Sequence, residues 1–346
     1  MGPPSVISSV LRVSIVVPVY NGGDGFRQCL ISLFKACPAP DEIIVVANGD
    51  SDGSSSLART FGARVLRLPK AVGPARARNI GALCATGDLL LFVDADVTIP
   101  VDAVDRVKTA FHQDQDLAAM FGSYDDAPGA SNFLSQYKNL LHHYVHQTSH
   151  ERACTFWGAC GAIRRTIFQE LGGFDERYRL PSVEDIELGY RLTQHGHRIR
   201  LCKALQVKHL KRWQWNTLLR AEVWQRAVPW TELILRDRRF LNDLNLRMSQ
   251  RVSVFLVYGL VAAVAAGWWW PGFLAVAAAE GVALLATNAP LYSFFANKRG
   301  VWFAAQTVPW HWLYFFYSGM AFGIGMFRHA IRRNVSSSPV PALESK

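Results

Sequence analysis

The chain has 346 residues, of which 50% are hydrophobic and 18% are charged, and its formal net charge is +10. Ordinary soluble domains carry about 25% charged residues, so this composition excludes a disordered chain and favours a membrane-attached protein of one or two domains. The six cysteines form no CxxC pair, which argues against a zinc knuckle and a dense disulfide framework. The basic excess is local, because residues 198–251 hold 13 basic and 4 acidic side chains.

Short runs rich in Val, Ile and Leu alternate with helix-compatible segments between residues 13 and 97. This alternation predicts βαβ units that feed a mostly parallel, buried sheet, as in a nucleotide-binding α/β domain. Ligands of open α/β sheets bind beyond the carboxyl ends of the strands. Polar residues follow two of the apolar runs, at Asn48 and at Asp94 to Asp96. We therefore expect the chemistry at these strand ends.

The α/β domain is predicted to occupy residues 1–213, because short turns and a basic, strand-like segment continue as far as Trp213. Residues 214–251 mix Trp, Leu and Arg in a helical pattern. Such a pattern is typical of amphipathic helices in a membrane interface, and an ordinary surface helix is the alternative.

Residues 252–333 are predicted to form a membrane domain of two or three helices, followed by a flexible tail at 334–346. The apolar runs 252–270 and 271–296 are each long enough to span roughly 30 Å of hydrocarbon, and a third run covers 301–327. Basic residues before the first run and after the second place both of these ends in the cytoplasm by the positive-inside rule. The basic cluster after the third run conflicts with an odd number of crossings, so the number stays open. Core helices of a soluble protein are the alternative.

The triplet DAD puts two carboxylates, Asp94 and Asp96, directly after the apolar run LLLFV. Hard oxygen ligands suit Mg²⁺ or Mn²⁺, and such a cation needs few protein ligands when a diphosphate supplies the others. A DxD triplet in a random loop is usually a solvated turn. Its position after a buried strand favours a metal site at Asp94 and Asp96.

Six segments occur in a fixed order: VSIVVPVYNGG, EIIVVANGDSDGS, GPARARNIGA, DAD, GGFDE and VEDIELGYRL. In this order and at these intervals they resemble glycosyltransferase family 2, over about two-thirds of the chain. The resemblance implies a GT-A nucleotide-diphospho-sugar transferase fold, here followed by transmembrane helices. It also implies a nucleotide-sugar donor, a divalent metal and an inverting transfer.

By this resemblance, Pro18, Tyr20 and Asn21 match the first-strand motif that lines the nucleoside site. The family usually has two acids after the second strand, where this chain has Ala47 and Asn48. Asn48 can still bond the edge of a base, and its neighbours Asp50 and Asp52 are alternatives. A UDP-sugar is the default donor, and guanosine and thymidine donors stay open.

The ARN element and the ED motif supply the remaining predicted site residues. Arg78 and Asn79 would address the phosphates or sugar hydroxyls of the donor, whereas Arg76 is expected on a solvated helix face. The acid that matches Asp185 is the general base in the family, and Glu184 would support it. Without the resemblance, acids in a first helical turn are more often dipole-compensating caps.

Several further residues could serve either ligand binding or the structure. The segment QRAVPW does not match the QxxRW spacing of processive synthases, and this mismatch disfavours long-chain synthesis. Arg226 in this segment would approach the donor diphosphate. Alternatively, the nearby tryptophans would anchor the chain at the membrane interface. Trp157 would lie beside the acceptor. His142, His143 and His146 have metal-binding spacing, although a packed helix face is favoured. His209 would contact phosphate or serve the structure.

Together these features predict a multi-pass protein of the cytoplasmic membrane whose catalytic domain faces the cytoplasm. It would transfer one sugar to a membrane-associated, lipid-linked acceptor, either a polyprenyl phosphate or a glycolipid. An enzyme that extends an exopolysaccharide or O-antigen repeat on its lipid carrier is an alternative, and a non-catalytic membrane scaffold is another. A nucleic-acid partner is not expected, because the basic residues adjoin the apolar runs, where anionic lipid is nearer.

Overall fold

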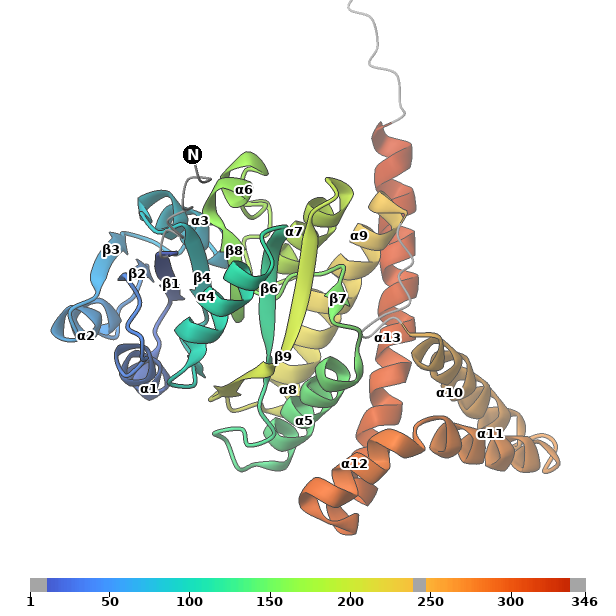
Figure 1. The fold of residues 1–346 in the computed structure, drawn as a ribbon. Coiled ribbons are helices and arrows are strands. Elements are labelled where there is room, and N and C mark those ends of the chain that lie inside the picture. The colour runs from blue at the N-terminus through green and yellow to red at the C-terminus, as the bar shows by residue number, and fades with distance from the viewer. Residues whose placement is uncertain (1–10, 239–246, 337–346) are drawn as a thin grey trace, which may run out of the picture. The chain divides into compact units, whose positions relative to one another are not determined.

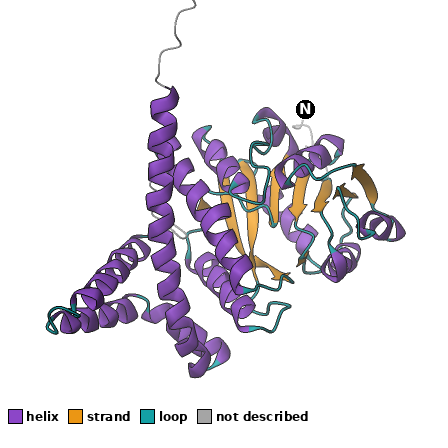
Figure 2. Cartoon of the chain, turned by 180° about the vertical axis from the view of Figure 1, so that it is seen from behind, coloured by secondary structure: helices purple, strands orange, loops and turns teal. Residues whose placement is uncertain are grey.

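The computed structural model describes residues 11–238 and 247–336 of the chain. The chain divides into two compact units, Met1–Gln214 and Trp215–Lys346. The first unit contains the sheet and the helices that cover it, and the second is helical wherever it is described (Figure 2).

Within the described residues, nine strands form one sheet with the order β3-β2-β1-β4-β8-β6-β9-β5, and β7 pairs with β9 (Figure 1). The strands are β1 (Val13–Val19), β2 (Glu42–Asn48), β3 (Arg64–Leu68), β4 (Leu89–Val93), β5 (Val97–Thr98), β6 (Leu117–Tyr124), β7 (Arg152–Ala153), β8 (Cys160–Arg164) and β9 (Arg198–His209).

The predicted parallel arrangement holds for β1 to β4, where every neighbouring pair is parallel. The rest of the sheet is mixed, because β8 lies antiparallel between β4 and β6, and β5 and β7 are antiparallel to β9. Runs of apolar residues mark buried strands but do not encode strand direction, so the description "mostly parallel" applies only to the first half.

Helices cover both faces of the sheet, which explains why its central strands are apolar at successive positions. The helices of this unit are α1 (Gly23–Phe34), α2 (Ser54–Thr60), α3 (Pro74–Cys84), α4 (Ala103–Gln113), α5 (Phe133–Thr148), α6 (Arg165–Glu170) and α7 (Glu184–Gln194). One core packs against α1, α2 and α4, and a second packs against α3, α6 and α7. On β1, Ile15 and Val17 face the first core and Val16 faces the second.

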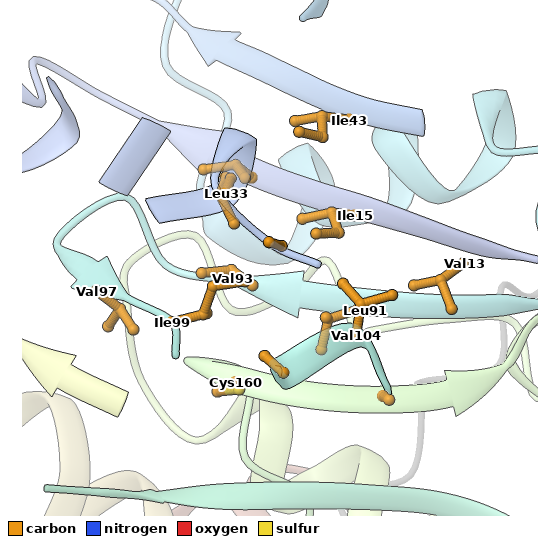
Figure 3. Close-up of a cluster of buried hydrophobic side chains, with 14 of the residues drawn as sticks. Val13, Ile15, Leu33, Ile43, Leu91, Val93, Val97, Ile99, Val104 and Cys160 are labelled. Atoms are coloured by element: carbon orange, nitrogen blue, oxygen red, sulfur yellow. The ribbon is translucent and has the colours of Figure 1, made fainter. Parts of the chain in front are cut away.

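The first core extends across four neighbouring strands and fixes the strand ends that carry the polar loops. Figure 3 shows part of it, with Ile15, Ile43, Leu91 and Cys160 contributed by β1, β2, β4 and β8. These four side chains are at most 8% exposed. The loops after β1, β2 and β4 therefore start from a rigid base.

The second unit begins with α8 (Trp215–Arg220), the π-helix η1 (Ala221–Ala227) and α9 (Val228–Asp237). It continues with α10 (Met248–Ala266), α11 (Phe273–Thr287), α12 (Ala289–Arg299) and α13 (Val301–Ser336). Of the described helices, α10 is long and apolar enough to cross a membrane. A second candidate span is formed by α11 and α12 together, which are bent by 63° at their junction. The third apolar run, now part of α13, is not among the candidate spans.

Candidate active site

The loops after β1 and β2 are fastened to each other by side-chain hydrogen bonds. The Oδ1 atom of Asn21 accepts from the backbone N–H of Ser51 at 2.9 Å, and the Asp52 carboxylate accepts from the N–H of Gly23 at 3.0 Å. Asn21 has a φ of 50°, which an Asn tolerates better than most residues. Tyr20, the residue before Asn21, is 60% exposed. The predicted nucleoside-binding loop is thus held rigidly while its aromatic side chain stays open.

The polar residues after β2 use their oxygens to organise the backbone around them. Buried Asn48 accepts from the N–H of Val72 at 2.8 Å, and Asp50 accepts from the N–H of Ser55, in the first turn of α2, at 3.0 Å. No described residue accepts from the amide nitrogen of Asn48, so that group is still available as a donor.

The DAD triplet lies where the sequence predicts it, directly after the buried strand β4. Asp94 accepts a hydrogen bond from Arg78 Nη2 at 2.6 Å, and an Asp96 oxygen lies 3.6 Å from His209 Nε2. Burial by itself would raise the pKa of Asp96, but the interaction with His209 and the charge of Lys211 outweigh it and lower the pKa. The two side chains are 33% and 39% exposed, so each still reaches solvent.

This pair of carboxylates is a small donor set for a metal. No group of three or more His, Cys, Asp and Glu side chains in the described part of the chain could hold a cation. Two partly exposed carboxylates nevertheless fit an ion such as Mg²⁺ or Mn²⁺ that takes its other oxygens from phosphates and water. Asp94 and Asp96 are therefore the residues that could hold it.

Arg78 connects the DAD triplet to the ED motif. Its side chain is 6% exposed, and its guanidinium donates to Asp94 and, at 2.9 Å, to Glu184 Oε1. Gly158 leaves room for it, since a Cβ there would lie 3.3 Å from the guanidinium carbon. The Nε atom of Arg78 is buried without a hydrogen-bond partner among the described residues. Two segments distant in sequence thus meet at one buried cation.

The neighbours of Arg78 on α3 have different surroundings. Asn79 is buried, and its amide bonds both backbone groups of Phe174 and the carboxylate of Glu176. It therefore holds the loop of the GGFDE segment, and its hydrogen-bonding groups are engaged there. Arg76 is mostly exposed, with Nε 3.5 Å from Glu176. Of these three residues, Arg78 is the one that reaches the DAD carboxylates.

Helix α7 places Asp185 beside the loop that precedes β8. One Asp185 oxygen accepts from the N–H of Gly158 at 3.0 Å, and the other accepts from the N–H of Ile186 at 2.8 Å. Burial and the nearby charge of Glu184 raise the pKa of Asp185 to about 6, although the bond from Gly158 and the charge of Arg78 oppose the shift. A partly exposed carboxyl group with such a pKa can take up and release a proton near neutral pH.

Gly189 explains why α7 can approach this closely. A Cβ at that position would lie 2.3 Å from the backbone nitrogen of Phe156 and 2.4 Å from the carbonyl carbon of Thr155. The helix therefore packs directly on the backbone that leads to Gly158. Only glycine permits this contact, which brings Asp185 and Gly158 within bonding distance.

An aromatic cluster that the sequence reasoning missed joins the two acidic groups. The ring of Tyr124 stacks on His209, with centroids 4.4 Å apart, and meets Trp157 edge-on at 4.7 Å. His209 contacts Asp96, and Trp157 precedes the residue that bonds Asp185. An aromatic residue at the end of a strand gives no distinct signal in sequence, because such residues usually belong to the core.

The three histidines of α5 pack around this cluster. His143 Nδ1 lies 2.7 Å from the carbonyl oxygen of Tyr124, and the ring of His142 packs against those of His146 and Trp157. Burial lowers the pKa of His146 to about 3, so this side chain is neutral at physiological pH. The spacing that suggested metal ligands thus serves packing in the described structure.

Arg226 belongs to the second unit, where η1 carries it. Its guanidinium is bonded to the buried Glu222 at 2.9 Å, and Trp224 beside it is 54% exposed. π-Helices are rare and often occur at functional sites.

The sequence and the fold both have known counterparts. Residues 14–172 match the model of the family described as "Glycosyl transferase family 2". The chain is 34% identical to the uncharacterized glycosyltransferase YibD of Escherichia coli over 119 residues, which cover 33% of this chain and 34% of YibD. It is 27% identical to the probable glycosyltransferase YdaM of Bacillus subtilis over 219 residues, which cover 56% of this chain and 49% of YdaM. The chain thus spans between a third and a half of these relatives.

One solved structure, of S. aureus TarS 1-349 in complex with UDP-GlcNAc, resembles the chain with a TM-score of 0.51 and 20% identity over 67% of each chain. At this identity the likeness shows the fold alone. The matched residues include the DAD triplet after β4 and end before the ED motif at the start of α7. Residues 14–172 of the chain match glycosyltransferase family 2, and the first unit of the chain has the GT-A fold.

Proposed function

We propose that the chain is an inverting, metal-dependent glycosyltransferase that moves one sugar from a nucleotide-sugar donor to a lipid-linked acceptor at the cytoplasmic membrane. The observation that carries the proposal is the pairing of Arg78 with both Asp94 and Glu184. This pairing brings the carboxylates of the donor side next to Asp185, the proposed base.

The donor would bind across the carboxyl ends of β1, β2 and β4. Tyr20 and the free amide of Asn48 would contact the nucleoside, and a UDP-sugar is the default. Asp94 and Asp96 would hold Mg²⁺ or Mn²⁺, which neutralises charge on the leaving nucleoside diphosphate when bound. Asn21 and Asp50 would act through the loops that they fasten.

Asp185 would receive the proton of the acceptor hydroxyl as the oxygen attacks the anomeric carbon. The new bond to the acceptor forms as the bond to the diphosphate oxygen breaks on the opposite side, so the configuration inverts without a covalent enzyme intermediate. The two backbone N–H groups on Asp185 fix its orientation for this transfer. Glu184 stays paired with Arg78 and keeps that cation in place.

The second unit supports a membrane-associated acceptor. It contains the apolar helix α10. Arg247 directly precedes this helix, and Arg251 lies in its first turn. Basic residues beside an apolar segment favour the cytoplasmic side of a membrane with anionic lipids. A catalytic unit attached there would meet acceptors whose lipid part lies in the bilayer.

The test uses membranes that contain the full chain, a panel of radiolabelled nucleotide sugars, and Mn²⁺. We expect label from one donor to enter the organic extract, and this transfer to disappear in Asp185→Asn. The control variant Asp102→Asn changes an exposed carboxylate that pairs with Arg106, and it should transfer at the wild-type rate. Transfer into water-soluble product alone would contradict the lipid-linked acceptor. An absence of transfer and of donor hydrolysis with every nucleotide sugar would contradict the enzyme itself.

A further inference from the structure

The α10–α11 hairpin presents an apolar surface, and beyond Arg251 in the first turn of α10 its one charged residue is Glu280 of α11, which packs against Gly259 of α10. Helix α10 has 19 residues and is therefore about 28 Å long, close to the thickness of the hydrocarbon core of a bilayer. Its Phe255, Val261 and Val264 are 79%, 48% and 54% exposed. No charged residue occurs from 252 to 279. Such a surface is stable in lipid and costly in water.

The tip of the hairpin carries three consecutive tryptophans. Trp268, Trp269 and Trp270 are 88%, 81% and 70% exposed, and they lie between the end of α10 and the start of α11. Tryptophan is enriched where a membrane meets water. The opposite end of α10 begins at Met248 next to Arg247. The two ends of the hairpin thus fit the two interfaces of one bilayer.

Helix α13 has partners of two kinds along its length. At its middle, Phe315 packs with Val257 of α10 and Leu284 of α11, and the hydroxyl of Tyr258 donates to the carbonyl of Phe316 at 2.9 Å. These contacts lie at the middle of α10 and in the half of α11 that is farther from the tryptophan tip. Helix α13 therefore packs across the hairpin near its middle and away from the tryptophan tip.

Beyond that crossing, α13 packs on η1 and α9. Tyr317 and Ala321 share a core with Val223 and Val228. Gly325 fits against Thr231, and an added Cβ would lie 2.6 Å from its Cβ atom. Arg328 Nε then pairs with Glu232 of α9 at 3.1 Å. Because charged side chains are costly in hydrocarbon, a segment that is covered by a charged, amphipathic helix and ends in an ion pair fits the membrane surface better than the hydrocarbon core.

The first part of α13 also has an interfacial character. It runs from Val301 after the turn at Gly300 and contains Trp302, Trp310 and Trp312. It packs beside α12, which bends away from α11 by 63° and ends at Lys298 and Arg299. A bend of this size turns α12 out of the direction of the hairpin and toward the plane of the membrane.

From these contacts we infer that the α10–α11 hairpin crosses the lipid bilayer twice and that α13 does not cross it, so that both ends of α13 stay on the side of Arg247. This inference rests on the membrane attachment proposed above. It places the three basic clusters of the second unit on one side, as the positive-inside rule requires. The conflict that arises when α13 is treated as a third crossing then disappears.

Cysteine labelling tests the inference in the full chain. All six native cysteines lie between residues 29 and 202, so the second unit offers a background without thiols. Single cysteines are introduced at exposed positions: Trp269→Cys at the tip, Val301→Cys and Ile331→Cys near the two ends of α13, and Met248→Cys at the base. Spheroplasts are treated with a membrane-impermeant maleimide before and after permeabilisation.

We expect Trp269→Cys to be labelled in intact spheroplasts, and the other three to gain label over the wild-type chain only after permeabilisation. Labelling of either Val301→Cys or Ile331→Cys from outside would show that α13 crosses the membrane and would overturn the inference. If Trp269→Cys reacts only after permeabilisation, the hairpin does not reach the far side of the membrane. That result would also overturn the inference. The folding control is the labelling of the native cysteines after permeabilisation. A variant whose native cysteines are labelled as in the wild-type chain is folded. The readout needs no sugar transfer, so it stands apart from the test of the proposed reaction.

Discussion

Replacing Arg78 by methionine is expected to destabilise the catalytic unit strongly, because it leaves Glu184 unpaired inside the protein. The Glu184 residue is 4% exposed, and its remaining hydrogen bond comes from the backbone N–H of Ser182 at 2.8 Å. Breaking a buried ion pair on one side costs about 3–5 kcal/mol. The bond to Asp94 contributes less, since that carboxylate is 33% exposed and solvated. We therefore take the lower figure.

A loss of about 3 kcal/mol corresponds to a fall in Tm of about 6–12 °C for a unit of this size. The assay is thermal unfolding of the full chain in detergent, followed by tryptophan fluorescence and circular dichroism. Arg106→Met is the matched control, because Arg106 pairs with an exposed carboxylate and such a pair contributes about 1 kcal/mol or less.

The double variant Arg78→Met with Glu184→Gln separates pairing from packing. It should recover part of the lost stability, because the buried carboxylate is then neutral. The reasoning is refuted if the Tm of Arg78→Met lies within 1–2 °C of the Tm of Arg106→Met. A difference of that size is about the effect of an exposed ion pair. It is equally refuted if the losses of the two single variants simply add.

Five further outcomes follow from the geometry of the site. Asp185→Asn should lower the transfer rate about 10²- to 10⁴-fold, measured at saturating donor, because an amide cannot accept the proton. With the pKa of Asp185 raised to about 6, the wild-type rate should rise with pH through that value and then level off; a flat profile between pH 5 and 7 would contradict its role as base. Because the folded chain binds this proton more tightly than the unfolded chain, the Asp185 contribution to the free energy of unfolding should fall as pH rises from about 4 to about 6, and Asp185→Asn should remove that slope in denaturant titrations. Gly189→Ala should lower the Tm, since its Cβ would meet backbone atoms at 2.3 Å. The control Gly323→Ala on α13, whose Cβ would have no atom within 4 Å, should leave the Tm unchanged or raise it. Equal Tm values for the two variants would count against the close packing of α7. Treatment with EDTA should abolish transfer and added Mn²⁺ should restore it, while full activity in EDTA would exclude a metal held by Asp94 and Asp96.

The sequence predicted the features of the fold that depend on local patterns. The alternation of apolar runs and helical segments indicated β1 to β4 and the helices between them, and the motif order indicated the family, both in agreement with the structure and the comparisons. The direction of β8 was not predictable, because strand direction depends on how distant segments return to the sheet. The DAD triplet lies directly after β4, as expected.

The surroundings of individual side chains were less accessible to sequence reasoning. Arg78 and Asn79 are adjacent and both polar, yet one bridges two acidic motifs and the other locks a loop. Their difference arises from which long-range partners face each side of α3. Tyr124 and its stacking on His209 could not be foreseen, because the pairing joins β6 to the end of β9. The packing of α13 on α9 was hidden for the same reason, since both segments are amphipathic or apolar by composition alone.

The central claim is that Asp185 acts in the transfer and not in donor binding. The most direct test measures both properties in the full chain in detergent. Binding of UDP with Mn²⁺ is followed by calorimetry, and turnover is followed as release of nucleotide from the active donor. The account predicts that Asp185→Asn binds UDP as the wild-type chain does while its turnover falls at least about 100-fold. Turnover near the wild-type level in this variant would contradict the account.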